Sequence, residues 1–201
     1  MLDLSKLVPD EISGIQLIKE TNAKQVTISG KYENDRRFKL LLNRFIDEQL
    51  FNFGCGLFAG EGTKGGKGTP FEFANSNPKI IGAIMKLLDR LGIQKSIISP
   101  RLQLRLTEGE SETKVQDLMK FWSKYLGIPL DKFRKPSVRF RSSSGRSDYG
   151  TISIRINFGI IGRLFVFWTD QILRFNASPF PDRRKGTGSL AMRRQPGVSR
   201  S

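Results

Sequence analysis

Residues 53–62 read FGCGLFAGEG, a glycine-rich stretch inside an otherwise helical pattern. Apolar residues recur at helical spacing over about 40–60, which predicts a helix there. Each glycine inside a helix costs about 1 kcal/mol relative to alanine, so several of them need a structural reason. Gly56 and Gly60 are four residues apart and share one face of the helix. Small residues on one face let a second helix approach closely, so the pattern predicts helix–helix packing there.

The chain after this helix mixes helical and strand periodicity. Strict alternation of apolar and polar residues predicts strands over 101–107, 137–142 and 150–158, with a shorter strand around Phe71 and Phe73. Further helices are expected over about 77–91, 113–126 and 160–174. Alternation of this kind is typical of a sheet that packs on helices by one face only. We therefore expect an α+β fold, with an antiparallel sheet whose second face is open.

The open face of this sheet is rich in arginine. Arginine, glutamine and asparagine carry the donor and acceptor pairs that match guanine and adenine edges in the major groove. A membrane surface would need apolar residues beside the cations, and this face has none. The alternative is an ordinary solvated sheet face. The expected nucleic-acid contacts, including one in the loop between the last two strands, are Arg101, Gln103, Arg105, Arg139, Arg141, Arg146, Arg155 and Asn157.

The charge of the whole chain agrees with a polyanionic partner. The 201 residues include 34 Lys and Arg against 19 Asp and Glu, a formal net charge of +15. Composition divides the chain into an N-terminal extension over 1–42 with a strand or hairpin, a central domain over 43–174, and a basic tail over 175–201. The tail is rich in Pro, Gly, Ser and Arg, and we expect it to be disordered.

Several classes of protein are excluded by what the sequence lacks. There is no histidine, so Ser-His-Asp triads and zinc fingers are ruled out. The single cysteine, Cys55, allows no internal disulfide, which fits a reducing, cytoplasmic compartment. No apolar run is long enough to span a membrane, and the first twenty residues do not form a signal peptide.

The glycine-rich helix end resembles a known motif. GCGLFAGEG over 54–62 is similar to the LAGLIDADG motif of homing endonucleases, with Gly56, Leu57, Glu61 and Gly62 matching best. Ala59 stands where the namesake spelling has an acid, a position that varies in the family. The resemblance covers about 45–174, and it is to a divergent, single-motif branch found in prokaryotic genomes.

The resemblance implies a specific arrangement. In this family two motif helices pack at a twofold axis, so Gly56, Leu57 and Gly60 would form a homodimer interface. Glu61 and the Gly60 carbonyl would hold Mg²⁺ or Mn²⁺ over the DNA, with Lys64 or Lys67 assisting catalysis. Because only one motif occurs, two chains would act on a near-palindromic site.

Three functional hypotheses follow from the sequence. The first is a homodimeric, metal-dependent endonuclease specific for a site in double-stranded DNA. The second keeps the fold and the DNA contacts but has lost cleavage, which would make the protein a transcription regulator. The third is an RNA-binding protein that uses the same basic sheet.

Overall fold

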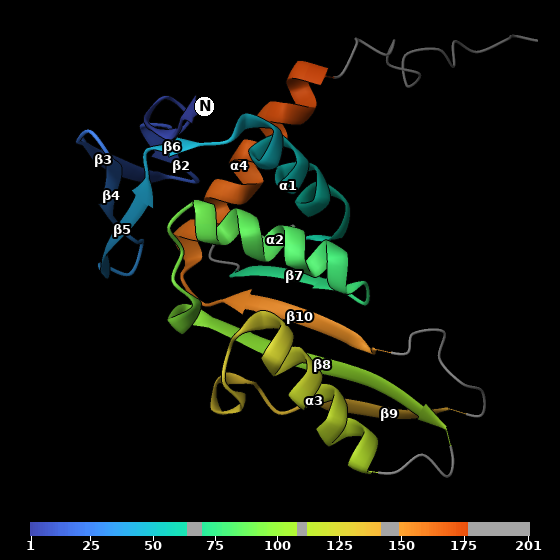
Figure 1. Ribbon diagram of the computed structural model, residues 1–201. Coiled ribbons are helices and arrows are strands. Elements are labelled where there is room, and N and C mark those ends of the chain that lie inside the picture. Colours follow the sequence, from blue (N-terminus) through green and yellow to red (C-terminus); the bar gives the residue numbers. More distant parts are fainter. Residues whose placement is uncertain (64–69, 108–111, 142–148, 177–201) are drawn as a thin grey trace, which may run out of the picture.

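The computed structural model describes residues 1–63, 70–107, 112–141 and 149–176 (Figure 1). The predicted basic tail, apart from its first two residues, lies outside this description, so its expected disorder stays a prediction. In the central part a four-stranded sheet is covered by four helices, which confirms the expected α+β class. The strands are β7 (Phe71–Asn75), β8 (Ile98–Thr107), β9 (Ser137–Arg141) and β10 (Thr151–Ile156).

The strand order in this sheet is β7-β10-β8-β9. β10 pairs with β7 and β8 in antiparallel fashion, as the sequence predicts. β8 and β9 are parallel, a departure from a wholly antiparallel sheet. The reason is the helix α3 (Glu112–Leu126) between them, because a helical crossover carries the chain back to the end where the first strand began.

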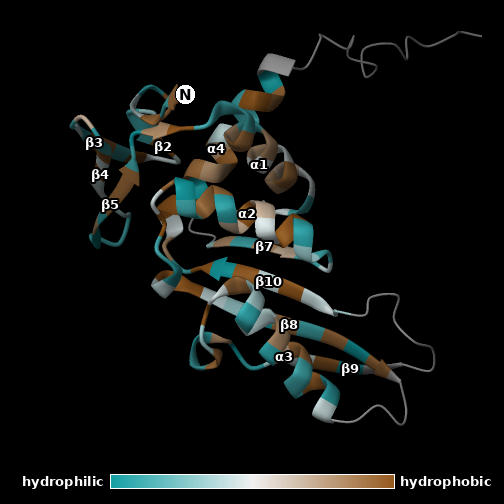
Figure 2. Ribbon diagram, viewed as in Figure 1, coloured by the Kyte–Doolittle hydropathy of each residue, from teal (hydrophilic) through white to brown (hydrophobic). Residues whose placement is uncertain are grey.

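Four helices accompany the sheet, and each carries both hydrophobic and hydrophilic segments (Figure 2). Besides α3 they are α1 (Glu48–Glu61), α2 (Pro78–Arg90) and α4 (Gly159–Asn176). Phe58 of α1 stacks on Phe71 of β7 with ring centroids 5.2 Å apart, and Phe165 of α4 lies 4.7 Å from Phe71. This aromatic contact fixes α1 and α4 against the first strand of the sheet.

The first helix begins later than the sequence pattern predicts. Leu40 and Leu42 belong to the strand β5 (Arg37–Asn43), where both are buried while Leu41 between them is 46% exposed. That alternation has the period of a strand, and the run of leucines concealed it in the sequence. The helix begins after Asp47, whose carboxylate accepts a hydrogen bond from the Leu50 amide at 2.8 Å.

Residues before α1 form a second, smaller sheet. Its antiparallel strands, in spatial order, are β2 (Glu11–Ile12), β3 (Ile15–Thr21), β4 (Gln25–Lys31) and β5. A separate pair joins β1 (Leu2–Asp3) to β6 (Phe45–Ile46). Short 3-10 turns span Leu4–Lys6, Lys95–Ile97 and Leu130–Lys132.

The small sheet packs on α4. Leu40 and Leu42 face Leu164 and Trp168 of that helix around a small apolar void. The Trp168 indole N–H donates to the Leu7 carbonyl at 3.0 Å. The buried residues of this sheet belong to the same core as those of the helices.

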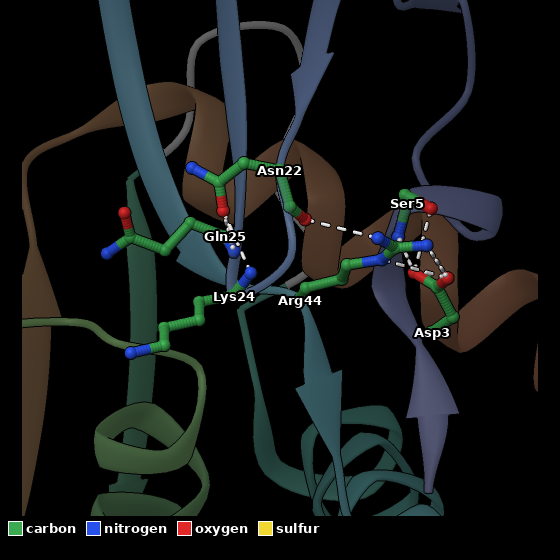
Figure 3. Close-up of polar contacts among 6 residues, drawn as sticks. All are labelled: Asp3, Ser5, Asn22, Lys24, Gln25 and Arg44. Atoms are coloured by element: carbon green, nitrogen blue, oxygen red, sulfur yellow. Dashed lines mark hydrogen bonds and ion pairs between the residues drawn. The ribbon is translucent and has the colours of Figure 1, made fainter.

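An ion pair fixes the turn between β3 and β4 (Figure 3). Arg44 donates to the Asp3 carboxylate from Nη2 at 2.9 Å and from Nε at 3.1 Å, and to the Asn22 carbonyl from Nη1 at 3.1 Å. The Asn22 side chain in turn accepts from the Lys24 and Gln25 amides. Hydrogen bonds from Arg44 and Ser5 hold the pKa of the Asp3 carboxyl well below its usual range.

This pair predicts an acid-dependent loss of stability. Because the Asp3 pKa is lower in the folded than in the unfolded protein, its contribution is complete above the unfolded pKa of about 4. The contribution is lost as the pH falls through the folded pKa. The melting temperature of Asp3→Asn should therefore lie below that of the wild type at neutral pH, and the gap should narrow between about pH 4 and about pH 2.

Thermal unfolding followed by circular dichroism across that pH range checks the expectation. The control is Asp10→Asn, because Asp10 forms an exposed ion pair with Lys19 at 2.6 Å, and exposed pairs contribute little. A constant gap between Asp3→Asn and the wild type at every pH would contradict the assignment.

Candidate nucleic-acid interface and motif helix

Glu61 is the last residue of α1 and its side chain is exposed. A carboxylate at the C-terminus of a helix faces the negative end of the helix dipole, at a cost of about 0.3–1 kcal/mol. The last turn of α1 has no basic residue that would offset this cost. Helix stability alone therefore does not account for an acid at this position.

The glycine after Glu61 has a clear steric role. A Cβ on Gly62 would lie only 2.4 Å from the Phe58 ring. Gly62 also forms an isolated bridge to Phe73, and the Thr63 amide donates to the Glu72 carbonyl at 2.9 Å. The chain thus leaves α1 pressed against the edge of β7, which places Glu61 beside the sheet.

The other glycines of α1 fall into two groups. A Cβ on Gly54 would lie 2.3 Å from Leu87 of α2, so this glycine allows the two helices to pack within the chain. Gly56 and Gly60 have nothing within 4 Å of an added Cβ, and both are exposed. Phe53, 57% exposed, lies at helical spacing from Gly56 on that same face. The structure therefore leaves an apolar, small-residue face of α1 uncovered.

Two of the three residues predicted to form a dimer interface lie on this uncovered face of α1. Gly56 and Gly60 lie on the uncovered face, while Leu57 is half-buried and packs against the core. We call Phe53, Gly56 and Gly60 the open face of α1.

The sheet brings most of the predicted nucleic-acid residues together on its open face. Arg101 lies opposite Ser153, Gln103 opposite Ser137, and Arg105 opposite Arg139 in neighbouring strands. Side chains of directly paired residues project from the same face. Arg155 and Asn157 continue this face along and just beyond β10.

These residues differ in exposure. Gln103, Arg105, Arg139 and Asn157 are exposed, while Arg101 and Arg155 are half-buried. Arg141 lies at the end of β9, but its side chain is outside the description. Arg146 and the two lysines considered for catalysis, Lys64 and Lys67, lie outside the described residues, so their roles stay predictions.

Glu72 also belongs to this face, although it is not among the residues predicted from the sequence. Glu72 of β7 pairs with Arg155 of β10, and its carboxylate lies 3.5 Å from Nη1 of that arginine. It also accepts a hydrogen bond from the Ser153 hydroxyl at 2.6 Å. Because Glu72 lies between the buried Phe71 and Phe73, the sequence alternation indicates that its side chain projects from the opposite, polar face of the strand. The pairing of Glu72 with Arg155 of β10 depends on the fold and is not visible in the sequence.

Metal ligands and nucleophiles are sparse in the described ranges. They contain no cluster of three or more acidic, cysteine or histidine side chains suited to a metal. Cys55 is fully buried, and burial raises the pKa of its thiol to about 12, so it is not a nucleophile at neutral pH. Among the described helices, none has the length and apolar character needed to cross a membrane.

The fold and its two open faces define the class of the protein. It is an α+β protein in which a glycine-containing helix ends in an acid beside a sheet with a basic face. Residues 48–111, which contain α1, β7, α2 and β8, match the family model of the LAGLIDADG-like domain. The segment that carries the motif is thus similar to the LAGLIDADG-like domain. Searches of curated proteins and of solved structures found no match.

Proposed function

We propose that the protein is a homodimeric, magnesium-dependent endonuclease that cuts double-stranded DNA at a near-palindromic site. The observation that carries the proposal is the exposed Glu61, which is the last residue of α1 and directly follows Gly60 of the open face of that helix. Neither the acid nor the uncovered glycines stabilise the isolated chain. Both acquire a role if two copies of α1 pack together and bring two Glu61 carboxylates to one place.

The basic sheet supplies the DNA contacts in this proposal. Exposed Arg105 and Arg139 lie opposite each other and suit phosphate or base-edge contacts. The regular spacing of strands lets several side chains follow the duplex at once. Two copies related by a twofold axis would contact two half-sites of a palindrome.

The oxygen donors at the end of α1 fit a hard divalent cation. Carboxylate and carbonyl oxygens are the ligands that magnesium prefers, and Glu61 and Gly60 provide one of each in every chain. One chain alone offers too few, so the site would need the second copy together with DNA phosphates. A bound magnesium ion would activate the attacking water and neutralise charge on the phosphate.

A DNA-binding regulator that does not cut is the second candidate. It is favoured by the scarcity of catalytic groups, since no cluster of three candidate metal ligands occurs in the described part of one chain. This candidate keeps the sheet interface and the homodimer but gives Glu61 no chemical role.

Selection from a randomised duplex DNA library distinguishes the candidates. The protein is incubated with the library in magnesium and, separately, in calcium, and both bound and cut molecules are sequenced. Cleavage at one near-palindromic site in magnesium alone would support the endonuclease. Enrichment without cutting in either metal would leave the regulator, and the absence of any enriched DNA would direct the same assay to RNA.

A further inference from the structure

Arg155 differs from the other arginines of the sheet because its guanidinium is held on two sides. Its Nε donates to the Asn157 side-chain oxygen at 2.7 Å. Its Nη1 lies 3.5 Å from the Glu72 carboxylate, in an ion pair whose side chains are 31% and 25% exposed. Such a pair is partly shielded from water, so it restricts the guanidinium more than an exposed pair would.

Glu72 is fixed in turn. Its other carboxylate oxygen accepts the 2.6 Å hydrogen bond from Ser153, whose side chain is completely buried. Ser153 pairs with Ala74, two register positions from the Glu72–Arg155 pair, so it is a diagonal neighbour of Glu72 on the same face. Two strands therefore position the carboxylate before any ligand binds.

A carboxylate on this face, here on the edge strand β7, is unfavourable for binding a polyanion in general. It repels phosphate and reduces the positive potential that attracts DNA of any sequence. Its presence is explained if it acts on a neighbouring side chain that reads the sequence. Preorganised contacts of this kind reduce the conformational entropy that a long side chain loses on binding.

The contacts leave one edge of the Arg155 guanidinium available. Of its five N–H donors, one on Nε and one on Nη1 are directed at Asn157 and Glu72. The remaining donors lie on Nη1 and Nη2, and a guanidinium presents such a pair to two acceptors at once. Guanine O6 and N7 are the acceptor pair that arginine contacts most often in the major groove.

We propose that Arg155 reads one guanine in each half-site and that Glu72 and Asn157 are positioning residues for it. The proposal rests on the proposed binding of duplex DNA, but it does not depend on cleavage. It changes the role expected for Asn157, whose oxygen orients Arg155 instead of contacting a base.

The neighbouring arginines provide the comparison. Within the described part of the chain, Arg105 and Arg139 have no carboxylate partner, and both are exposed. Unrestrained arginines suit phosphate contacts, which contribute affinity to every sequence alike. Loss of Arg139 should therefore weaken binding uniformly, whereas loss of the Glu72 restraint should act at one base.

The test is DNA selection in calcium with wild-type protein and the variants Glu72→Gln, Asn157→Ala, Arg155→Lys and Arg139→Gln. We expect the wild type to prefer guanine at one position of each half-site, and Glu72→Gln to reduce that preference about tenfold. Asn157→Ala and Arg155→Lys should reduce it at the same position. The affinity of Glu72→Gln for unrelated DNA should stay equal or rise, because a negative charge is removed. Arg139→Gln should lower affinity for all sequences without changing the preference.

Ser153→Ala serves as a second variant, because it removes a contact of Glu72 but no charge, and melting temperatures establish that each variant is folded. An unchanged guanine preference in folded Glu72→Gln would overturn the inference and leave the proposed DNA binding intact. Equal loss of preference at every position would also overturn it. If the wild type enriches no DNA site, the proposed function and this inference both fail.

Discussion

Glu61→Gln is expected to abolish DNA cleavage and to retain binding of the same DNA site. If the metal held by Glu61 contributes about 4 kcal/mol to stabilising the transition state, its loss lowers the cleavage rate about a thousandfold. Glutamine keeps the size of the side chain and removes the charge. The fold should be unaffected or slightly stabilised, because the charge opposes the helix dipole.

The measurement is single-turnover cleavage of the selected DNA in magnesium, with binding followed separately in calcium. Glu48→Gln is the matched control, since Glu48 is an exposed glutamate at the opposite end of α1. It should cut at the wild-type rate. Cleavage by Glu61→Gln at that same rate would remove Glu61 from the active site and refute the proposed metal site.

Gly56→Leu is expected to convert the proposed homodimer to a monomer. Two helices can approach at Gly56 only if no side chain fills the contact, so a leucine on both copies would separate them. Loss of close packing costing about 3 kcal/mol would weaken dimerisation more than a hundredfold. The monomer should keep its fold, because a Cβ at this position meets nothing within 4 Å and leucine is a better helix former than glycine. Sedimentation equilibrium measures the change, and Gly60→Leu should act in the same way.

Gly54→Ala is the matched control, because it is expected to lower the stability of the fold and to leave dimerisation unchanged. Its Cβ would clash with Leu87, and overpacking of this kind costs about 1–3 kcal/mol of stability, against a gain of about 1 kcal/mol in helix propensity. It should lower the melting temperature while the folded fraction still dimerises. A dimer that survives Gly56→Leu and Gly60→Leu would place the subunit interface elsewhere on the protein.

Periodicity predicted the central sheet well because each strand buries one face. Leu102, Leu104 and Leu106 are buried as their alternation indicates, and the isoleucines of β10 behave in the same way. Periodicity failed at Leu40–Leu42, where consecutive leucines fit a helix as well as a strand. The N-cap at Asp47 is the sequence signal that could have corrected the helix start.

Less of the candidate site than of the fold could be predicted from the sequence. The order β7-β10-β8-β9 depends on long-range pairing, so the sequence did not reveal that Glu72 lies beside Arg155. Nor could it separate Gly54, which packs inside the chain, from Gly56 and Gly60, which do not. Both distinctions depend on which neighbour approaches a residue in space.

The contact between the small sheet and α4 brings the two ends of the described chain together in one core. The Tyr32 hydroxyl accepts a hydrogen bond from the Ile160 amide at 3.1 Å, and Phe38 packs edge-on against Phe158. A protein shortened to begin at α1 would leave Leu164 and Trp168 facing water, and it would lose the partner of the first turn of α4. We therefore expect α4 to need residues 1–47 for its stability, so that a transplanted motif segment that includes α4 would have to carry those residues with it.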